Sequence, residues 1–313
     1  MTPGGVAGRH ILVEDRKATR LPYSRDAMAS SMMVIGIEPE LAYLISEEVE
    51  DLLVKRTTPM VGVEDLIEVA TACATHHAGR TMGERYAKWV AARRVQRPIV
   101  VLLGGAPGSG KSTVAGGIGS RLRITAVMPT DAVREVMRQL VSKTLSPILH
   151  VSSFEAHRVM RAPVPEDHDA VVIGFQQQAE VVASGVRGLV NRAIVEGSDL
   201  IVEGVHVLPG VFADDLAEWR RHAVVCHAVL AVPDPEQHRA HFLTRLERSP
   251  SRRPHRYLDA FPEVRRIHRY VSMVAESHGV PQLVMDLPDE TIQTVVQMVV
   301  DAVIEAEERD VSV

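Results

Sequence analysis

The chain has 313 residues, of which 46 % are apolar and 24 % are charged, and its formal net charge is −5. These values are ordinary for a globular protein with room for two domains, and the negative charge argues against attraction to nucleic acid or acidic membranes. The two cysteines match no metal-ligand spacing, no apolar run approaches the ~18 residues of a membrane span, and the sequence opens without a signal-peptide pattern. We therefore expect a cytoplasmic protein without a membrane or nucleic-acid partner.

The first part of the chain predicts a small, mainly helical domain. Residues 1–8 are small and predict a flexible tail, and the apolar run Ile11-Leu12-Val13 is long enough for a short strand. Apolar residues then recur with helical spacing in four segments, which are a helix capped by Ser24 and the ranges 38–55, 63–74 and 84–94. We place this domain at residues 9–95, because the polar stretch from Arg93 to Pro98 is the only plausible boundary.

The remainder of the chain, residues 96–313, predicts a second domain in which strands and helices alternate. Apolar strand patterns cover 99–103, 124–128, 199–203, 224–232 and 282–286. Helical patterns cover 111–122, 131–143, 171–196, 235–248, 259–277 and 289–308. This alternation is typical of an α/β fold with a doubly wound parallel sheet, which binds ligands at the carboxyl ends of its strands.

A glycine-rich turn between the first strand and the first helix of this domain predicts a nucleotide site. Residues 105–112, GAPGSGKS, match the pattern G-x-x-x-x-G-K-[S/T] at every specified position. The glycines allow backbone N–H groups to turn inward around a polyphosphate, Lys111 can reach the β- and γ-phosphates, and the Ser112 hydroxyl can hold Mg²⁺. The predicted nucleotide-binding residues are Gly105, Ala106, Gly108, Ser109, Gly110, Lys111, Ser112 and Thr113.

The second strand leads into a helix that begins with an acid. Asp131 stands at the carboxyl end of that strand, where it can accept the proton of an acceptor hydroxyl or orient a water molecule on Mg²⁺. The alternative is that Asp131 caps the helix. Arg134 and Arg138 share one face of the helix, so they either clamp an anionic substrate or form a solvated face.

The third strand ends in a second acid, Glu203. A carboxylate at this position commonly orders Mg²⁺ or its waters, so Ser112 and Glu203 together predict a magnesium site. His206 follows three residues later and is either a substrate contact or a structural histidine. The remaining histidines form no ligand set, which argues against a metal other than Mg²⁺.

An arginine-rich segment over 239–256 predicts a lid. It contains Arg245 and Arg252 among six arginines, and its two prolines interrupt the preceding helix. Such a lid could close over phosphates and exclude water, whereas an RNA-binding arm is the rival interpretation. Further candidate substrate contacts are Ser152 and Ser153 after an apolar turn and Arg187 on the long helix.

Several strings in the chain resemble the 2-phosphoglycerate kinase family. They are GGAPGSGKST (104–113), PTDAVREVMR (129–138), HVSSFEA (150–156), GFQQQAEVV (174–182), NRAIVEGSDLIVEGVHVLPG (191–210) and RRPHRYLDAFPEVRRIHRYV (252–271). Residues 11–32 are similar to the ATP-cone domain that precedes the kinase domain in those enzymes. The resemblance extends from about residue 9 to residue 305. The cone's usual glycine turn is missing, since Arg16-Lys17 is followed by Ala18-Thr19.

The resemblance implies a P-loop kinase fold and transfer of the γ-phosphoryl group of ATP to the free hydroxyl of 2-phosphoglycerate, giving 2,3-bisphosphoglycerate. ATP and Mg²⁺ would be the cofactors, with Lys111, Asp131 and Glu203 as catalytic residues. Substrate contacts would come from Arg134, Arg138, Ser152, Ser153, Arg187, His206, Arg245 and Arg252. The cone would be a second nucleotide site or a regulatory and oligomerising module, which would suit a homodimer.

Three alternatives stay open at this point. The acceptor could be 3-phosphoglycerate or another small phosphorylated hydroxy acid, since nothing in the sequence fixes the carbon that presents the hydroxyl. The protein could be a kinase of a nucleic-acid end or a nucleotide sugar, which oligonucleotide binding that weakens steeply with salt would support. It could also be a non-catalytic ATP sensor, which tight ATP binding without acceptor-dependent ADP release would support.

Overall fold

The computed structural model describes residues 11–14, 18–56, 60–94, 97–248 and 255–311. The chain folds into two units, one formed by residues 1–95 together with 303–313 and the other by residues 96–302. The flexible tail predicted at residues 1–8 lies outside the described residues.

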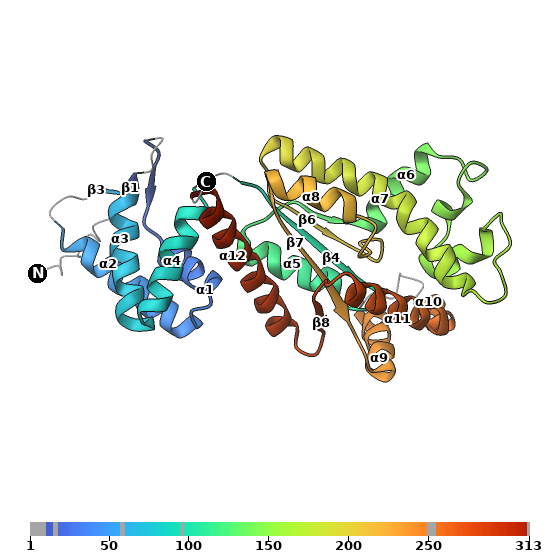
Figure 1. Cartoon of the computed structure of the whole chain (residues 1–313). Helices are drawn as coiled ribbons and strands as arrows, with labels where there is room; N and C mark the ends of the chain where they lie inside the picture. Colours follow the sequence, from blue (N-terminus) through green and yellow to red (C-terminus); the bar gives the residue numbers. More distant parts are fainter. Residues whose placement is uncertain (1–10, 15–17, 57–59, 95–96, 249–254, 312–313) are drawn as a thin grey trace, which may run out of the picture. The chain divides into compact units, whose positions relative to one another are not determined.

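The first unit combines helices with a three-stranded sheet (Figure 1). Its sheet has the order β2-β1-β3, with β1 antiparallel to β2 and parallel to β3. Ser24 caps the first helix, because its hydroxyl accepts a hydrogen bond from the Ala27 N–H at 3.2 Å. The elements are β1 (Leu12–Glu14), β2 (Arg20–Pro22), α1 (Arg25–Val34), α2 (Pro39–Val54), β3 (Met60–Gly62), α3 (Val63–Ala78) and α4 (Arg80–Ala92). Two of the strands, β2 and β3, were absent from the sequence prediction, since three-residue strands leave no apolar alternation to detect.

The second unit is built on a parallel sheet of five strands, which confirms the predicted α/β class. The strand order is β5-β6-β4-β7-β8, so the strand that leads into the glycine-rich turn lies at the centre. The strands are β4 (Ile99–Gly105), β5 (Val127–Pro129), β6 (Leu200–Glu203), β7 (Val224–Ala231) and β8 (Gln282–Val284). All neighbouring pairs are parallel, so the carboxyl ends of the strands share one edge of the sheet.

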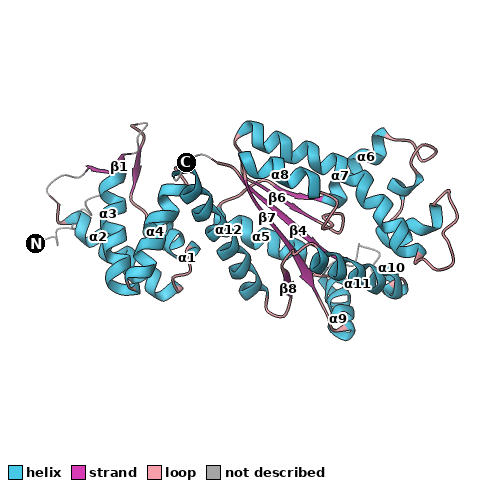
Figure 2. Cartoon of the chain, in the orientation of Figure 1, coloured by secondary structure: helices cyan, strands magenta, loops and turns pink. Residues whose placement is uncertain are grey.

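Helices cover both faces of this sheet (Figure 2). Helices α7 (Ala170–Glu196), α8 (Ala213–His222) and α11 (Phe261–Ser277) pack on the face that carries Val100, Leu102 and Val229. Helices α5 (Lys111–Leu122) and α12 (Pro288–Val311) pack on the other face, where Gly119 lies against Ile201 and the Cys226 thiol approaches the Met298 carbonyl. The other helices are α6 (Thr130–Leu140), η1 (Pro147–His150), η2 (Ser153–Val159), α9 (Pro235–Arg248) and α10 (His255–Asp259).

The central strand β4 is apolar along its whole length because it is covered on both faces. Residues Ile99 to Leu103 are each at most 1 % exposed. A strand buried on two faces has no solvated side, so it shows a continuous apolar run instead of alternation.

The structure corrects several predicted boundaries. The second strand begins at Val127 instead of residue 124, because Arg123 adopts a left-handed conformation (φ 58°) and the Ile124 N–H still bonds the Gly119 carbonyl of α5 at 2.8 Å. Helix α6 ends at Leu140 instead of 143, and Ala260 separates α10 from α11. Helix α8 was not predicted at all, since it buries only Trp219 and has a weak apolar pattern.

Within the described residues, none of the helices combines the length and apolarity needed to cross a membrane.

Candidate active site

The glycine-rich turn joins the carboxyl end of β4 to the first residue of α5. Gly105, Gly108 and Gly110 all have positive φ angles, of 141°, 82° and 82°. A side chain at Gly105 would also place its Cβ 2.6 Å from the Leu230 carbonyl oxygen of the neighbouring strand. Only glycine fits these positions, so the turn is held in a shape in which backbone N–H groups can face a bound anion.

Lys111 is the first residue of α5 and is only 9 % exposed. Its Nζ donates hydrogen bonds to the Ala106 carbonyl at 2.7 Å and towards the Ser109 hydroxyl at 3.5 Å. The ammonium group therefore lies over the loop and at the positive end of a helix. Both features favour an anion at this place.

Helix α9 holds the loop from its other side. His238 Nε2 donates to the Pro107 carbonyl at 2.7 Å and His241 Nδ1 donates to the Gly108 carbonyl at 3.0 Å. The Arg265 guanidinium donates to His238 Nδ1 at 3.1 Å, which fixes the neutral Nε2–H tautomer of that ring. Burial is the main reason that the pKa of His238 is lowered to about 4. No role was predicted for these two histidines, although their spacing of three after a strand places both on one helical face.

Ser112 and Glu203 meet beside the loop. The Ser112 hydroxyl donates to Glu203 Oε1 at 2.7 Å, and β6 brings Glu203 opposite Leu103 of β4. The Glu203 side chain is 5 % exposed and has no ion pair within the described part of the chain. A buried carboxylate without a cation is unfavourable, so a hard divalent cation fits this pair of oxygen ligands.

Asp131 lies on the same edge of the sheet but in a different environment. It belongs to the first turn of α6, whose N-cap is Pro129 and has no side-chain capping bond. The Asp131 carboxylate is 70 % exposed and lies 3.6 Å from Arg134 Nε. The alternative that Asp131 caps the helix is therefore not supported, and its carboxylate is accessible to a ligand.

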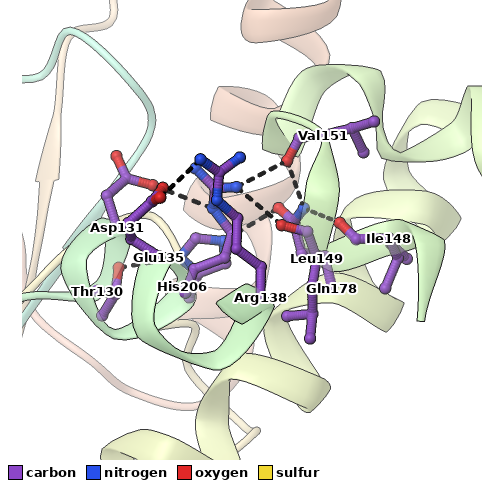
Figure 3. A network of polar contacts seen from close by, with 10 residues as sticks. Thr130, Asp131, Glu135, Arg138, Ile148, Leu149, Val151, Gln178 and His206 are labelled. Carbon is purple, nitrogen blue, oxygen red and sulfur yellow. Dashed lines mark hydrogen bonds and ion pairs between the residues drawn. The ribbon is translucent and has the colours of Figure 1, made fainter. Parts of the chain in front are cut away.

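The two arginines of α6 have protein partners. Arg134 is 14 % exposed and donates through Nη1 to the carbonyls of Leu149, at 2.9 Å, and Val151, at 3.2 Å. Arg138 pairs with Glu135 at 2.6 Å (Figure 3). Arg134 therefore links the segment around η1 to α6. If it also binds substrate, as predicted, the same guanidinium would serve both contacts.

His206 lies beneath the site rather than in it. The ring is completely buried and contacts the Thr130 hydroxyl through Nδ1 at 2.9 Å and Gln178 Oε1 through Nε2 at 3.0 Å. Burial lowers the pKa of His206 to about 4, so the ring is neutral near pH 7. Both nitrogens have partners within the protein, which favours the structural alternative over the predicted substrate contact.

The other predicted substrate residues are dispersed. Ser152 is half-buried and Ser153 is buried at the start of η2. Arg187 bonds Asp215 and the Val211 carbonyl, both at 2.8 Å, and stands nine residues beyond Gln178, about 14 Å further along α7. It is therefore a structural residue outside the site. Arg252 and the side chain of Arg245 lie outside the described residues.

The last part of the arginine-rich segment contacts η2. Arg256 pairs with Glu155, and its guanidinium lies 5.4 Å from the centre of the Phe154 ring. Burial is the largest single influence on the pKa of Glu155 and raises it. The hydrogen bond and the charge of Arg256 outweigh burial, so the pKa of Glu155 lies below its usual range. Arg256 therefore contacts the helix that Ser153 begins, and the lid stays a prediction, because residues 249–254 lie outside the described residues.

Curated relatives match most of the chain. The 2-phosphoglycerate kinase of Methanothermobacter thermautotrophicus is 35 % identical over 270 residues, which cover 86 % of this chain and 87 % of the relative. That of Methanopyrus kandleri is 36 % identical over 300 residues, covering 96 % and 90 %. That of Thermococcus kodakarensis is 34 % identical over 285 residues, covering 91 % and 95 %. No protein-family model matches the chain.

Among solved structures, a putative kinase from Chloroflexus aurantiacus is similar over 66 % of this chain and 98 % of its own, with 16 % identity and a TM-score of 0.36. The sequence relatives identify the family, because three of them are more than 30 % identical to this chain over most of both lengths. The chain belongs to the 2-phosphoglycerate kinase family.

Proposed function

We propose that this kinase transfers the γ-phosphoryl group of ATP to the free hydroxyl of 2-phosphoglycerate, forming 2,3-bisphosphoglycerate. The observation that carries the proposal is the convergence of three features at one sheet edge: a phosphate loop, an exposed Ser112 hydroxyl bonded to the buried Glu203 carboxylate, and an exposed Asp131. The acceptor is taken from the curated relatives, which are named 2-phosphoglycerate kinases.

In this proposal the loop and Lys111 hold the phosphates of ATP. The positive φ angles of Gly105, Gly108 and Gly110 allow the backbone N–H groups of the loop to turn towards phosphate oxygens. Lys111 Nζ now bonds a backbone carbonyl, from which it can move to the β- and γ-phosphates. Ser112 and Glu203 would hold Mg²⁺, which neutralises charge on the phosphates when it is bound.

Asp131 is the proposed general base. As the acceptor oxygen forms a bond to the γ-phosphorus, the bond from that phosphorus to the bridging β–γ oxygen breaks and ADP leaves with its electron pair. The hydroxyl proton passes to the Asp131 carboxylate. Arg134 Nε lies 3.6 Å from the Asp131 carboxylate, so the proposed base stands beside a cation of its own helix.

The acceptor carries both a carboxylate and a phosphate, so its site needs cations and donors. Arg134 and Arg138 belong to α6 like Asp131, and Ser152 directly follows Val151, whose carbonyl accepts from Arg134. Arg256 pairs with Glu155 of η2. We propose these groups as the acceptor site, with Arg245 and Arg252 as further predicted contacts. A homodimer and an ATP-cone role for residues 9–95 also stay predictions.

The test is ADP production with Mg²⁺-ATP and a panel of acceptors, with product positions identified by ³¹P NMR. The panel holds 2-phosphoglycerate, 3-phosphoglycerate, glycerate, a nucleoside and a DNA 5′ end. Turnover restricted to 2-phosphoglycerate is expected. Preference for another phosphoglycerate would change the acceptor, and hydrolysis independent of every acceptor would favour the ATP-sensor alternative.

Lys111→Ala provides the site control for this assay. We expect it to remove at least about 99 % of the turnover, because the loop loses its only phosphate-reaching cation. Lys143→Ala, at an exposed position after α6, is the matched control and should be unaffected. If Lys111→Ala kept near-normal turnover with an unchanged circular dichroism spectrum, the phosphate loop would not be the active site.

A further inference from the structure

A buried row of polar side chains connects the proposed base to the segment that precedes Ser152 (Figure 3). It runs from Thr130 through His206 to Gln178, and all three side chains are completely buried. Gln178 Nε2 donates to the carbonyls of Ile148, at 2.6 Å, and Val151, at 3.0 Å. The catalytic proposal uses none of these three side chains.

The hydrogen bonds of this row have a single direction. Two carbonyl acceptors fix the Gln178 amide so that Oε1 faces His206 and must accept. His206 Nε2 therefore carries the proton, and the neutral ring leaves Nδ1 as an acceptor. The Thr130 hydroxyl must then donate to His206 Nδ1. The position of two backbone carbonyls thus determines the orientation of a hydroxyl beside the active site.

At the Thr130 end, the row lies where the backbones that carry the two carboxylates come together. Thr130 is directly followed by Asp131, and Glu203 is directly followed by Gly204. A Cβ on Gly204 would lie 1.7 Å from the Thr130 hydroxyl oxygen, so this hydroxyl is in contact with the Gly204 backbone. Pro129 and Glu203 are also register partners in the sheet. The Thr130 side chain therefore packs between the start of α6 and the end of β6.

At the other end, the row fixes the segment that leads to Ser152. The Val151 carbonyl accepts from both Gln178 and Arg134, and Arg134 also bonds the Leu149 carbonyl. The residues just before Ser152 are thus held from α7 and from α6 at once. Asp131, four residues from Glu135 and three from Arg134, shares the helix that makes one of these attachments.

We propose that Thr130, His206 and Gln178 are positioning residues that hold the Asp131 carboxylate at a fixed distance from the Ser112–Glu203 pair and couple it to the 148–153 acceptor segment. The proposal rests on the proposed roles of Asp131 and Ser152. The Thr130 end affects the rate of phosphoryl transfer, because it positions the proposed base, Asp131. The Gln178 end affects acceptor binding, because it positions the segment before Ser152.

The first test compares Thr130→Val with Thr130→Ser in the full chain. Valine keeps the shape and removes the donor, whereas serine keeps the hydroxyl. We expect Thr130→Val to lower kcat about 10- to 100-fold, with an unchanged ATP dissociation constant by calorimetry, because misplacing a reacting group costs about that factor. Thr130→Ser should stay within about threefold of the wild-type kcat. Equal kcat values in both variants would overturn the proposal.

A matched pair at His206 separates the two ends of the row. Asparagine can place an acceptor where Nδ1 stands and thus keep the Thr130 contact, and glutamine can place a donor where Nε2 stands and thus keep the Gln178 contact. His206→Asn should mainly raise the KM for 2-phosphoglycerate, and His206→Gln should mainly lower kcat. The reverse pattern, or identical losses of kcat, KM and thermal stability in both, would show a merely structural role.

An activity-independent measurement keeps this inference distinct from the proposed function. Long-range ¹H–¹⁵N NMR at pH 7 should show His206 as the Nε2–H tautomer in the wild type. An Nδ1–H or doubly protonated ring would overturn the row's direction whatever the substrate. If the wild type turns over no phosphoglycerate while the tautomer is as expected, the proposed function fails and the assigned hydrogen-bond direction remains.

Discussion

The two carboxylates of the candidate site, Glu203 and Asp131, differ in their surroundings, and this difference suits them to different roles. Glu203 is buried and accepts from Ser112, so it is suited to a fixed cation. Asp131 is 70 % exposed beside Arg134, so a ligand hydroxyl can reach it. A third polar group, His206, has neither access nor charge and can act only through its neighbours.

Replacement of the proposed base tests this division at the residue scale. Asp131→Asn removes the proton acceptor but keeps the size of the side chain, so kcat should fall at least about 100-fold. The ATP dissociation constant should stay unchanged, because Asp131 is not part of the phosphate loop. Steady-state kinetics and calorimetry measure the two quantities.

Glu135→Gln is the matched control, since Glu135 stands one turn further along α6 and pairs with Arg138. It should keep most of the wild-type kcat. If Asp131→Asn instead lowered the melting temperature with little effect on kcat, Asp131 would be a structural residue of the helix start.

At the element scale, the site depends on how β5 and β6 end. Both strands lead directly into the site, one through Thr130 and the other through Gly204. Gly204 has a φ angle of 157° and lies against the Thr130 side chain. The close approach leaves no room for a side chain between the two strand ends.

Gly204→Ala should therefore destabilise the fold by about 2 kcal/mol or more, because the new Cβ clashes with a buried side chain and its backbone conformation disfavours alanine. Gly188→Ala on α7 is the control, since a Cβ there meets nothing within 4 Å. It should be neutral or stabilise by about 0.5–1 kcal/mol. Denaturant unfolding measures both, and equal stabilities would contradict the packing of Thr130 on Gly204.

At the scale of the whole molecule, four buried histidines link stability to pH. Burial is the main cause in lowering the pKa values of His206, His227, His238 and His268 to about 4. The unfolded chain takes up these protons near pH 6.5, whereas the folded protein takes them up only near pH 4. The unfolded chain therefore binds more protons than the folded protein between about pH 6.5 and pH 4. The free energy of unfolding is highest above about pH 6.5 and falls as the pH falls towards 4.

We expect the free energy of unfolding to fall by about 1 kcal/mol per pH unit for each of these histidines between pH 6 and pH 5. Denaturant titrations at several pH values measure it. His227→Leu should remove roughly a quarter of the histidine-dependent slope, since one of four protons is lost. A free energy of unfolding that is flat from pH 7 to pH 5 would show that these rings titrate near their ordinary values.

The end of α12 changes how the two units can be separated. Residues 303–313 belong to the first unit, where Glu308 pairs with Lys88 at 2.7 Å and Val303, Ile304 and Ala306 are buried. A fragment of residues 96–302 should bind ATP as a monomer, whereas a fragment of residues 96–313 should self-associate through these apolar residues. Sedimentation velocity distinguishes the two. If both fragments had the same association state, residues 303–313 would not need the first unit to cover their apolar side chains.

The sequence by itself determined those features that depend on local backbone chemistry and on period. The phosphate loop could be predicted because its glycines need positive φ angles and its Lys and Ser have fixed places. The parallel sheet followed from continuous apolar strands alternating with amphipathic helices. Each of these signals is local to one turn, one strand or one helix, so no knowledge of distant packing was needed.

Only the tertiary structure decided which polar side chains meet. Gln178 and His206 are 28 residues apart and Thr130 and His206 are 76 apart, so no spacing in the sequence marks their contact. Arg187 was also predicted as a candidate substrate contact, yet its guanidinium bonds Asp215 and the Val211 carbonyl. The physical reason is that a side chain's access to the site depends on the packing of whole helices, which sums many long-range apolar contacts that no local pattern encodes.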